Sequence, residues 1–329
     1  MNATSQSSGA AIVDAVADFN GDGKLDLVVS QGGTDIQVSL GNGDGTFQPG
    51  VLYSVPEDVR TISVGDFNGD GTLDLAIGEK RDQLTILLGN GDGTFHAGAT
   101  QMLPSNPTAA VTGDFNGDGK LDLVLVAPGQ GASQGLWLLL GNGDGTFQPP
   151  VELYSRYPRF DRVVAADFNG DGILDLAIDG PIIFLGNGDG TFRQGASYDA
   201  GPAEFLLTAD FNGDGIPDLA SGANILLGNG DGTFRPSSCC SLPMIPNEGA
   251  VGDFNGHGNL DIALTFGQPN LIGILVGNGD GTFSLSPYFG AGWGPRALVA
   301  GAFSGGMPDL LFLDQFGPSG LQVLMNATR

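Results

Sequence analysis

A nine-residue pattern, Asp-Phe-Asn-Gly-Asp-Gly-x-x-Asp, recurs along this 329-residue chain and constrains its fold more than any other feature. The copies lie at Asp18–Asp26, Asp66–Asp74, Asp114–Asp122, Asp167–Asp175, Asp210–Asp218 and, with His257 in place of the central Asp, Asp253–Asp261. A degenerate seventh copy, one residue shorter, lies at Ala302–Asp309. The starts are 48, 48, 53, 43, 43 and 49 residues apart. The chain is therefore one unit repeated seven times.

A second signature, Gly-Asn-Gly-Asp-Gly-Thr-Phe, follows each of the first six loops by about twenty residues. Its copies are Gly41–Phe47, Gly89–Phe95, Gly141–Phe147, Gly186–Phe192, Gly228–Phe234 and Gly277–Phe283. Seven units of 47 residues account for the 329 residues. Residues 1–329 are therefore predicted to form a single repeat domain, although length alone would allow two ordinary domains.

The unit reads as four short strands. In the second unit we expect strands at Thr61–Gly65, Leu73–Ile77, Leu84–Leu88 and from Phe95 onward, separated by Gly, Asn and Asp. Asn-Gly-Asp-Gly supplies residues that tolerate positive φ in a tight hairpin. This pattern predicts an all-β fold, a seven-bladed β-propeller of four-stranded antiparallel blades.

Small and aromatic residues recur at fixed places in the unit. The strand before each loop ends in small residues, such as Val64-Gly65 and Ala165-Ala166, which suits an innermost strand. Thirteen of the twenty Phe residues fall in the two signatures, so we expect them to pack between blades. The last unit ends after its third strand, and Asn2–Ser7 are placed to supply a fourth.

The nine-residue loop offers the oxygen ligands that calcium prefers. Calcium takes six to eight oxygens from carboxylates, amides and carbonyls. Side-chain oxygens at positions one, three, five and nine, with the backbone carbonyl of position seven, form the predicted site. The predicted residues are Asp18, Asn20, Asp22, Lys24, Asp26, Asp66, Asn68, Asp70, Thr72, Asp74, Asp114, Asn116, Asp118, Lys120, Asp122, Asp167, Asn169, Asp171, Ile173, Asp175, Asp210, Asn212, Asp214, Ile216 and Asp218.

The alternative is that these loops are only Asn-Gly and Asp-Gly turns. Each pair of carboxylates about 5 Å apart repels by about 3 kcal/mol at an effective dielectric constant near 20, which a cation would relieve. A turn also has no evident need for the Asp at position nine. We therefore expect five calcium ions and allow for a sixth.

The last two loops depart from the pattern. His257 makes the sixth site, Asp253, Asn255 and Asp261, a weak one, because imidazole is a poor ligand for calcium. The seventh copy retains only Asp309 and should bind no ion. The hairpin signature carries a single Asp, for which a turn is the expected role.

The two signatures together resemble the FG-GAP or VCBS-type repeats of integrin α-chain propellers and their bacterial relatives. The resemblance covers essentially the whole chain. It implies a seven-bladed propeller with calcium in the loop between the first and second strands of a blade. It also implies that ligand binds on the opposite face, as in integrins, whereas fungal lectins of similar architecture bind sugars between blades. Calcium loops in at least five units favour a bacterial-type relative, and the closeness of the repeats also allows consensus design.

Charge limits the class of partner. The formal charge is −25, with 37 acidic and twelve basic residues. Such a surface argues against nucleic acid and anionic membranes as partners, and no apolar stretch is long enough for membrane insertion. Calcium loops with millimolar dissociation constants fill outside cells, so we expect a secreted or cell-surface protein. We also expect a monomer. Cys239 and Cys240 are adjacent; a surface pair is the default reading, and a vicinal disulfide the alternative.

Basic and aromatic residues mark a candidate ligand surface on the face away from the loops. Arg and Trp are common at binding hot spots. The candidate residues are Arg60, Arg81, Arg156, Tyr157, Arg159, Arg162, Trp293 and Arg296. The alternative is a rim of solvated Arg side chains that balance neighbouring Asp.

The sequence thus predicts a calcium-stabilised binding or adhesion module for a glycan or an extracellular protein. A lyase-like enzyme acting on polysaccharides and a structural spacer are the alternatives. Catalysis is the less favoured reading, because the two histidines, His96 and His257, have no evident partner and no catalytic triad can be assembled.

Overall fold

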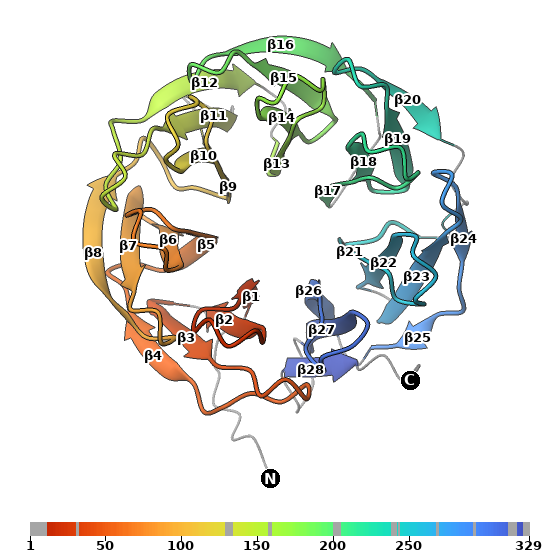
Figure 1. Ribbon diagram of the computed structural model, residues 1–329, viewed down its shortest axis with the longest axis horizontal. Coiled ribbons are helices and arrows are strands. Elements are labelled where there is room, and N and C mark those ends of the chain that lie inside the picture. Colours follow the sequence, from red (N-terminus) through yellow and green to blue (C-terminus); the bar gives the residue numbers. More distant parts are fainter. Residues whose placement is uncertain are drawn as a thin grey trace.

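The computed structural model describes residues 12–30, 33–128, 134–156, 160–199, 205–237, 242, 244–267, 270–291, 294–314 and 321–324. These residues form seven antiparallel sheets arranged in a ring (Figure 1). The described part of the chain contains no helix, and so none that could cross a membrane. The predicted fold is confirmed: the protein is a seven-bladed β-propeller.

The strands of each blade follow one another from the axis outward (Figure 1). The innermost strands are β1 (Ile12–Ala17), β5 (Val59–Gly65), β9 (Ala109–Gly113), β13 (Val163–Ala166), β17 (Leu206–Ala209), β21 (Glu248–Gly252) and β26 (Pro295–Gly301). The second strands are β2 (Asp26–Ser30), β6 (Asp74–Glu79), β10 (Asp122–Pro128), β14 (Asp175–Ile178), β18 (Asp218–Ser221), β22 (Asp261–Phe266) and β27 (Asp309–Asp314). The third strands are β3 (Asp35–Ser39), β7 (Gln83–Gly89), β11 (Gln134–Leu139), β15 (Ile182–Gly186), β19 (Asn224–Gly228), β23 (Leu271–Gly277) and β28 (Leu321–Leu324). The outermost are β4 (Val51–Ser54), β8 (Phe95–Met102), β12 (Val151–Arg156), β16 (Phe192–Ser197), β20 (Phe234–Ser237) and β24 (Phe283–Leu285).

Two blades differ from the rest at their outer edge. In blade six the outer strand is interrupted, because both β24 and the short β25 (Phe289–Gly290) pair with β23. In blade seven the described residues form three strands, β26 to β28. Asn2–Ser7, which we expected to supply the fourth, lie outside the described residues.

Small residues end the innermost strands because the next blade packs directly against them. A side chain at Gly65 would place its Cβ 2.6 Å from Leu121, and one at Gly113 would place it 2.4 Å from Leu174. Leu121 and Leu174 each belong to the loop of the following blade. The prediction that these small residues belong to an innermost strand is therefore confirmed.

The two signature Phe residues form the contacts between blades. In six of the seven loops, the Phe packs edge-on or tilted against the hairpin Phe of the next blade, with ring centroids 5.4–6.0 Å apart. The pairs are Phe19–Phe95, Phe67–Phe147, Phe115–Phe192, Phe168–Phe234, Phe211–Phe283 and Phe303–Phe47. Packing between blades is thus confirmed as their role.

The last pair closes the ring. Phe303 of blade seven contacts Phe47 of blade one, and the Phe303 carbonyl accepts a hydrogen bond from Gly45 N–H at 2.9 Å. A Cβ on Gly301 would approach Leu25 of blade one to 2.6 Å. The interface between the first and last blades therefore repeats the contacts of the other interfaces.

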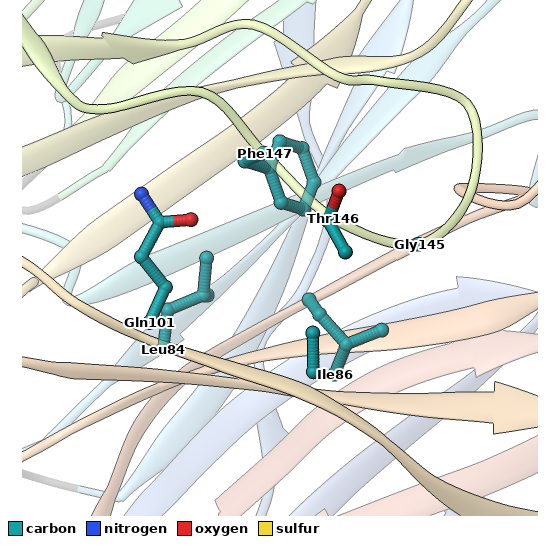
Figure 2. A pocket seen from close by; sticks show the side chains of 7 residues that line it. Leu84, Ile86, Gln101, Gly145, Thr146 and Phe147 are labelled. Atoms are coloured by element: carbon teal, nitrogen blue, oxygen red, sulfur yellow. The ribbon is translucent and has the colours of Figure 1, made fainter.

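Hairpins fill the space between neighbouring blades. Figure 2 shows the hairpin residues Gly145, Thr146 and Phe147 of blade three beside Leu84 and Ile86 of blade two. The cavity between them has a volume of about 10 Å³, room for about one water molecule. It is too small for a sugar.

We predict that Phe168→Ala destabilises the propeller by about 3–5 kcal/mol, because it leaves a cavity between blades four and five. Phe168 is fully buried and packs on Phe234 at 5.4 Å. Phe289→Ala is the control, since Phe289 is 48% exposed and should tolerate truncation. Urea unfolding would measure both, and equal midpoints would contradict the packing role.

Candidate metal centre

The nine-residue loops all lie on one face of the ring. Each loop joins the first and second strands of its blade, and each hairpin signature joins the third and fourth. Because neighbouring strands are antiparallel, both connections emerge at the same end of the sheet. We call this the loop face. The turns between second and third strands and the links between blades form the opposite face.

The loop coils around the carboxylate at its first position. In the second blade, Asp66 Oδ1 accepts hydrogen bonds from Gly69 N–H at 2.7 Å and Asp70 N–H at 3.1 Å, and Oδ2 accepts one from Gly71 N–H at 2.9 Å. Gly69 and Gly71 have φ of 75° and 87°, values that side chains disfavour. The glycines at these two positions have positive φ in all six copies.

The third and fifth positions face each other across the same coil. Asn68 Oδ1 accepts Asp70 N–H at 2.9 Å, and Asp70 Oδ1 accepts Thr72 N–H at 2.8 Å. The Asn68 amide also donates to Asp70 Oδ2 at 2.8 Å. Positions one, three and five therefore place their side-chain oxygens within one turn of the backbone.

The Asp at position nine has a structural role that the sequence did not indicate. It is fully buried in the first six copies. Asp26 Oδ2 accepts Phe19 N–H at 2.9 Å, and its Oδ1 accepts Gly41 N–H, from the hairpin, at 2.8 Å. The same two bonds recur at Asp74, Asp122, Asp175, Asp218 and Asp261. This carboxylate ties the loop of each blade to the hairpin of the same blade.

The first position of the hairpin signature must be glycine, because the hairpin backbone passes very close to the loop backbone there. A Cβ at Gly41 would lie 2.1 Å from the backbone oxygen of Leu25, and the other five copies are similarly close. In the sequence, this glycine and the position-nine Asp occur together in every complete unit. That co-occurrence could have indicated their contact.

The degenerate seventh copy keeps the buried carboxylate and its bond within the loop, without the acidic residues of the other loops. Asp309 is 1% exposed, and its carboxylate accepts Ser304 N–H at 2.8 Å. Positions one and three of this copy, Ala302 and Ser304, carry no carboxylate. The premise that a turn has no need for the position-nine Asp is therefore wrong, and the case for calcium rests on positions one, three and five.

The loops fit calcium in the chemistry of their donors. Asp and Asn offer only oxygen ligands to a hard cation, and calcium is held by such ligands. Burial raises the pKa of the position-nine Asp in all six copies, and the first-position Asp adds to the rise by repulsion. For Asp218 the pKa reaches about 6. A cation beside these carboxylates would favour their charged form.

Several of these oxygens accept hydrogen bonds from the protein itself. Among the described residues, no group of three or more Asp, Glu, His or Cys side chains is gathered closely enough to hold a metal ion. The calcium ligands at positions one, three, five, seven and nine therefore stay a prediction.

The sixth loop differs from the second and fourth in its hydrogen bonds. Without an Asp at position five, the Asn255 amide donates to both oxygens of Asp261, at 3.2 and 3.0 Å. In the second and fourth loops the equivalent amide donates to the position-five Asp instead. The sixth loop thus directs an N–H donor towards the carboxylate that a cation would need.

The hairpin Asp residues stabilise their own turns. Asp44 Oδ1 accepts hydrogen bonds from both the backbone and the hydroxyl of Thr46, at 3.0 and 2.5 Å. These bonds lower the pKa of Asp44, and the same arrangement recurs in the other hairpins.

A depression of about 310 Å³ lies on the loop face between blades two and three. Its lining residues are Asp66, Gly69, Gly119, Lys120, Leu121 and Gly143. Because Asp66 is a predicted metal ligand, this depression belongs to the loop site itself.

The opposite face separates the candidate ligand residues. Arg60 and Arg81 lie in blade two, where both lower the pKa of Asp58 after the larger effect of Lys80. Arg81 is 81% exposed and pairs with Glu57 at 2.8 Å. Arg162 lies in blade four, 3.7 Å from Asp179. Of these three residues, the structure therefore brings together Arg60 and Arg81 and places Arg162 apart from them.

The remaining candidates lie outside what is described. Tyr157, Arg159 and Trp293 are outside the described residues, as are Cys239 and Cys240. Arg156 and Arg296 belong to β12 and β26, but their side chains are outside the described part. Glu57 and Asp58, which pair with Arg81 and Lys80, were not among the predicted residues.

Comparison with known proteins identifies the repeat. Residues 18–77, 66–125 and 114–178 each match the family model of the FG-GAP-like repeat. The fold is similar to that of BBS1N in its complex with ARL6DN, with a TM-score of 0.65, 12% identity, and 98% of this chain and 93% of that chain covered. It is also similar to Sqt1 of Saccharomyces cerevisiae, with a TM-score of 0.57, 12% identity, and coverage of 97% and 87%. No curated protein matches the sequence.

We predict that, with a chelator present, Asp175→Asn destabilises the protein by about 1–3 kcal/mol, because one buried N–H loses its acceptor. Asp171→Asn, in the same loop but exposed, should change the stability by about 0.5 kcal/mol or less under these conditions. Chemical unfolding in the chelator would measure both. Equal losses would contradict a separate structural role for position nine.

Proposed function

Because this chain is an FG-GAP repeat β-propeller, we propose that it is a calcium-stabilised extracellular binding module whose ligand docks on the face opposite the loops. The observation that carries the proposal is the difference between the two faces. The loop face repeats the same residues in blade after blade, whereas the opposite face carries side chains that differ from blade to blade. A specific ligand is recognised by such blade-specific residues on a rigid scaffold.

A protein or a glycan would fit this face. BBS1N, which shares the fold, is seen in a complex with another protein. In this chain, Arg60 and Arg81 stand exposed on blade two, beside Lys80. Arg side chains donate several hydrogen bonds in a fixed geometry, which suits carboxylates of either class of ligand.

Calcium is proposed as a stabiliser of the ring, since its loops adjoin the contacts between blades. The Phe67 carbonyl, inside the second loop, accepts Gly145 N–H from the hairpin of blade three at 2.9 Å. The residues that would hold the ion in this loop are Asp66, Asn68, Asp70 and Asp74, with the Thr72 carbonyl. The ion would neutralise carboxylates and fix the coil of the loop.

The proposed location follows from the affinity expected of such loops. Sites with a Kd of about 10⁻⁴–10⁻³ M, as in extracellular modules, fill outside the cell and not in cytosol. We therefore propose secretion or display at the cell surface.

Calcium should raise the thermal stability of the chelated protein. Each filled site with a Kd of about 10⁻⁴–10⁻³ M adds about 1–3 kcal/mol at about 10 mM calcium, because the ion binds the folded state. Differential scanning calorimetry with chelator, calcium or magnesium would measure the shift in Tm.

The matched variant for this experiment removes the position-five carboxylate from three loops, as Asp70→Asn, Asp118→Asn and Asp171→Asn together. It should show a smaller calcium shift and the same Tm in chelator. If the Tm of the unaltered chain does not depend on calcium, the calcium proposal is contradicted.

Binding should depend on the opposite face of blade two. On an array of glycans and extracellular matrix proteins with calcium present, Arg60→Ala combined with Arg81→Ala should weaken a detected interaction at least about tenfold, as hot-spot arginines do. Arg235→Ala is the control, because Arg235 is exposed on the outer strand β20. Unchanged binding by the double variant would contradict this surface. If no ligand on the array is bound, a structural spacer is favoured. If acidic polysaccharides are cleaved, an enzyme is favoured.

A further inference from the structure

Each complete unit contains two Asn-Gly pairs in different surroundings. The loop pairs begin at Asn20, Asn68, Asn116, Asn169, Asn212 and Asn255. The hairpin pairs begin at Asn42, Asn90, Asn142, Asn187, Asn229 and Asn278. Asn before Gly is chemically labile, because the small glycine lets its backbone nitrogen reach the Asn side-chain carbon.

Five of the six loop pairs are shielded from this reaction by a hydrogen bond, and all six by partial burial of the Asn. Their Asn residues are half-buried. The N–H of the following glycine donates to the first-position carboxylate at 2.7 Å in loops two to six, at Gly69, Gly117, Gly170, Gly213 and Gly256. The negative charge of that carboxylate opposes formation of the amide anion that would attack the Asn side chain.

The hairpin pairs lack this protection. All six hairpin Asn residues are exposed. In the described part of the chain, the N–H of the following glycine, such as Gly91, forms no hydrogen bond with another residue. The Asn amide nitrogen donates to the hairpin Thr hydroxyl at 2.8–2.9 Å, which fixes which way the amide group points.

One hairpin carries an additional group at the reacting atom. His96 Nδ1 lies 2.8 Å from Asn90 Oδ1. Because Thr94 accepts from the amide nitrogen of Asn90, the oxygen faces the imidazole, and the ring nitrogen must donate. The equivalent residues in the other hairpins are Gln48, Gln148, Arg193, Arg235 and Ser284. His96 thus has a partner, contrary to the expectation from sequence.

We propose that Asn90–Gly91 is a site of spontaneous deamidation, assisted by His96. The Gly91 nitrogen loses its proton to water or hydroxide and attacks Asn90 Cγ, forming a carbon–nitrogen bond. Negative charge develops on Oδ1, where the His96 N–H stabilises it as an oxyanion donor would. Nδ2 then takes a proton from water, the oxyanion re-forms the carbonyl, and the Cγ–Nδ2 bond breaks so that ammonia leaves. Water opens the resulting succinimide to aspartate or isoaspartate.

The product changes an interface between blades. Either product adds a negative charge, and isoaspartate also lengthens the backbone of the hairpin. Phe95, at the end of the same hairpin, packs on Phe19 of blade one at 5.5 Å. The modification therefore acts on the contact between the first two blades, and it does not depend on the calcium proposal.

The experiment is to incubate the full chain at mildly alkaline pH and follow the Asn residues of the twelve Asn-Gly pairs by peptide mapping with mass spectrometry. The hairpin residues should convert before the loop residues. Asn90 should convert about fivefold faster than Asn42 and Asn142, the factor expected of one hydrogen bond to the developing charge.

His96→Gln is the matched variant, because Gln occupies this position in hairpins one and three and the side chain is exposed. It should reduce the rate at Asn90 to that of Asn42 and Asn142. In urea all twelve residues should react at similar rates. Equal rates at Asn90 and Asn42 in the folded protein, or no effect of His96→Gln, would overturn the assistance by His96. Loop residues reacting as fast as hairpin residues would overturn the shielding.

Discussion

A buried carboxylate at the end of each loop holds the blade together on the loop face. In the first six loops its two oxygens accept one N–H from the loop and one from the hairpin, as Asp122 does with Phe115 and Gly141. Hydrogen bonds from N–H groups to a buried carboxylate are strong, and losing one leaves a charge or a donor without a partner. The hairpin fixed in this way reaches the neighbouring blade, where Gly145 N–H meets the Phe67 carbonyl and Phe147 meets Phe67. The contacts between blades therefore depend on a bond made within each blade.

The imperfect copies separate the structural role from the proposed metal role. The sixth loop has lost the position-five Asp but keeps both bonds of Asp261. The seventh has lost positions one, three and five as ligands and still buries Asp309. Phe303 of that copy nevertheless closes the ring against Phe47. Since a blade forms here without the ligand set, calcium would reinforce the propeller and would not be a template for every blade. The acidic loops carry a cost of their own, because burial, and then repulsion from the Asp residues at positions one and five, raises the pKa of the buried carboxylate.

The fold could be predicted from sequence because its evidence is periodic. Seven copies of one pattern fix the number of blades, and the positions of the small residues and of Phe follow from what every copy must do. Contacts between residues that form only in the folded chain were not predicted. Asp26 and Gly41 are 15 residues apart and meet only when the hairpin folds back over the loop. His96 finds Asn90 across a turn that five other hairpins make without a histidine. The opposite face was the least predictable, because its residues do not repeat. Arg60 and Arg162 were both candidates for one ligand surface, yet they lie two blades apart.

The turn between β6 and β7 supports blade two as the place of the proposed ligand contact. Arg81 and Asp82 have φ of 58° and 63°, a conformation that costs free energy for residues with a side chain. The corresponding turns of blades four and five place glycine there, Gly180 and Gly222, at φ of 77° and 59°. The repeat thus offers an unstrained solution that blade two does not use. Asp82 N–H is held by Asn106 Oδ1 at 3.3 Å, and Lys80 N–H by the Asp58 carbonyl at 2.8 Å, so the strained turn is fixed from the adjoining links. Strain of this kind persists where the surrounding structure enforces it and the displayed side chain matters. The side chain displayed here is Arg81, the most solvent-exposed partner among the described ion pairs.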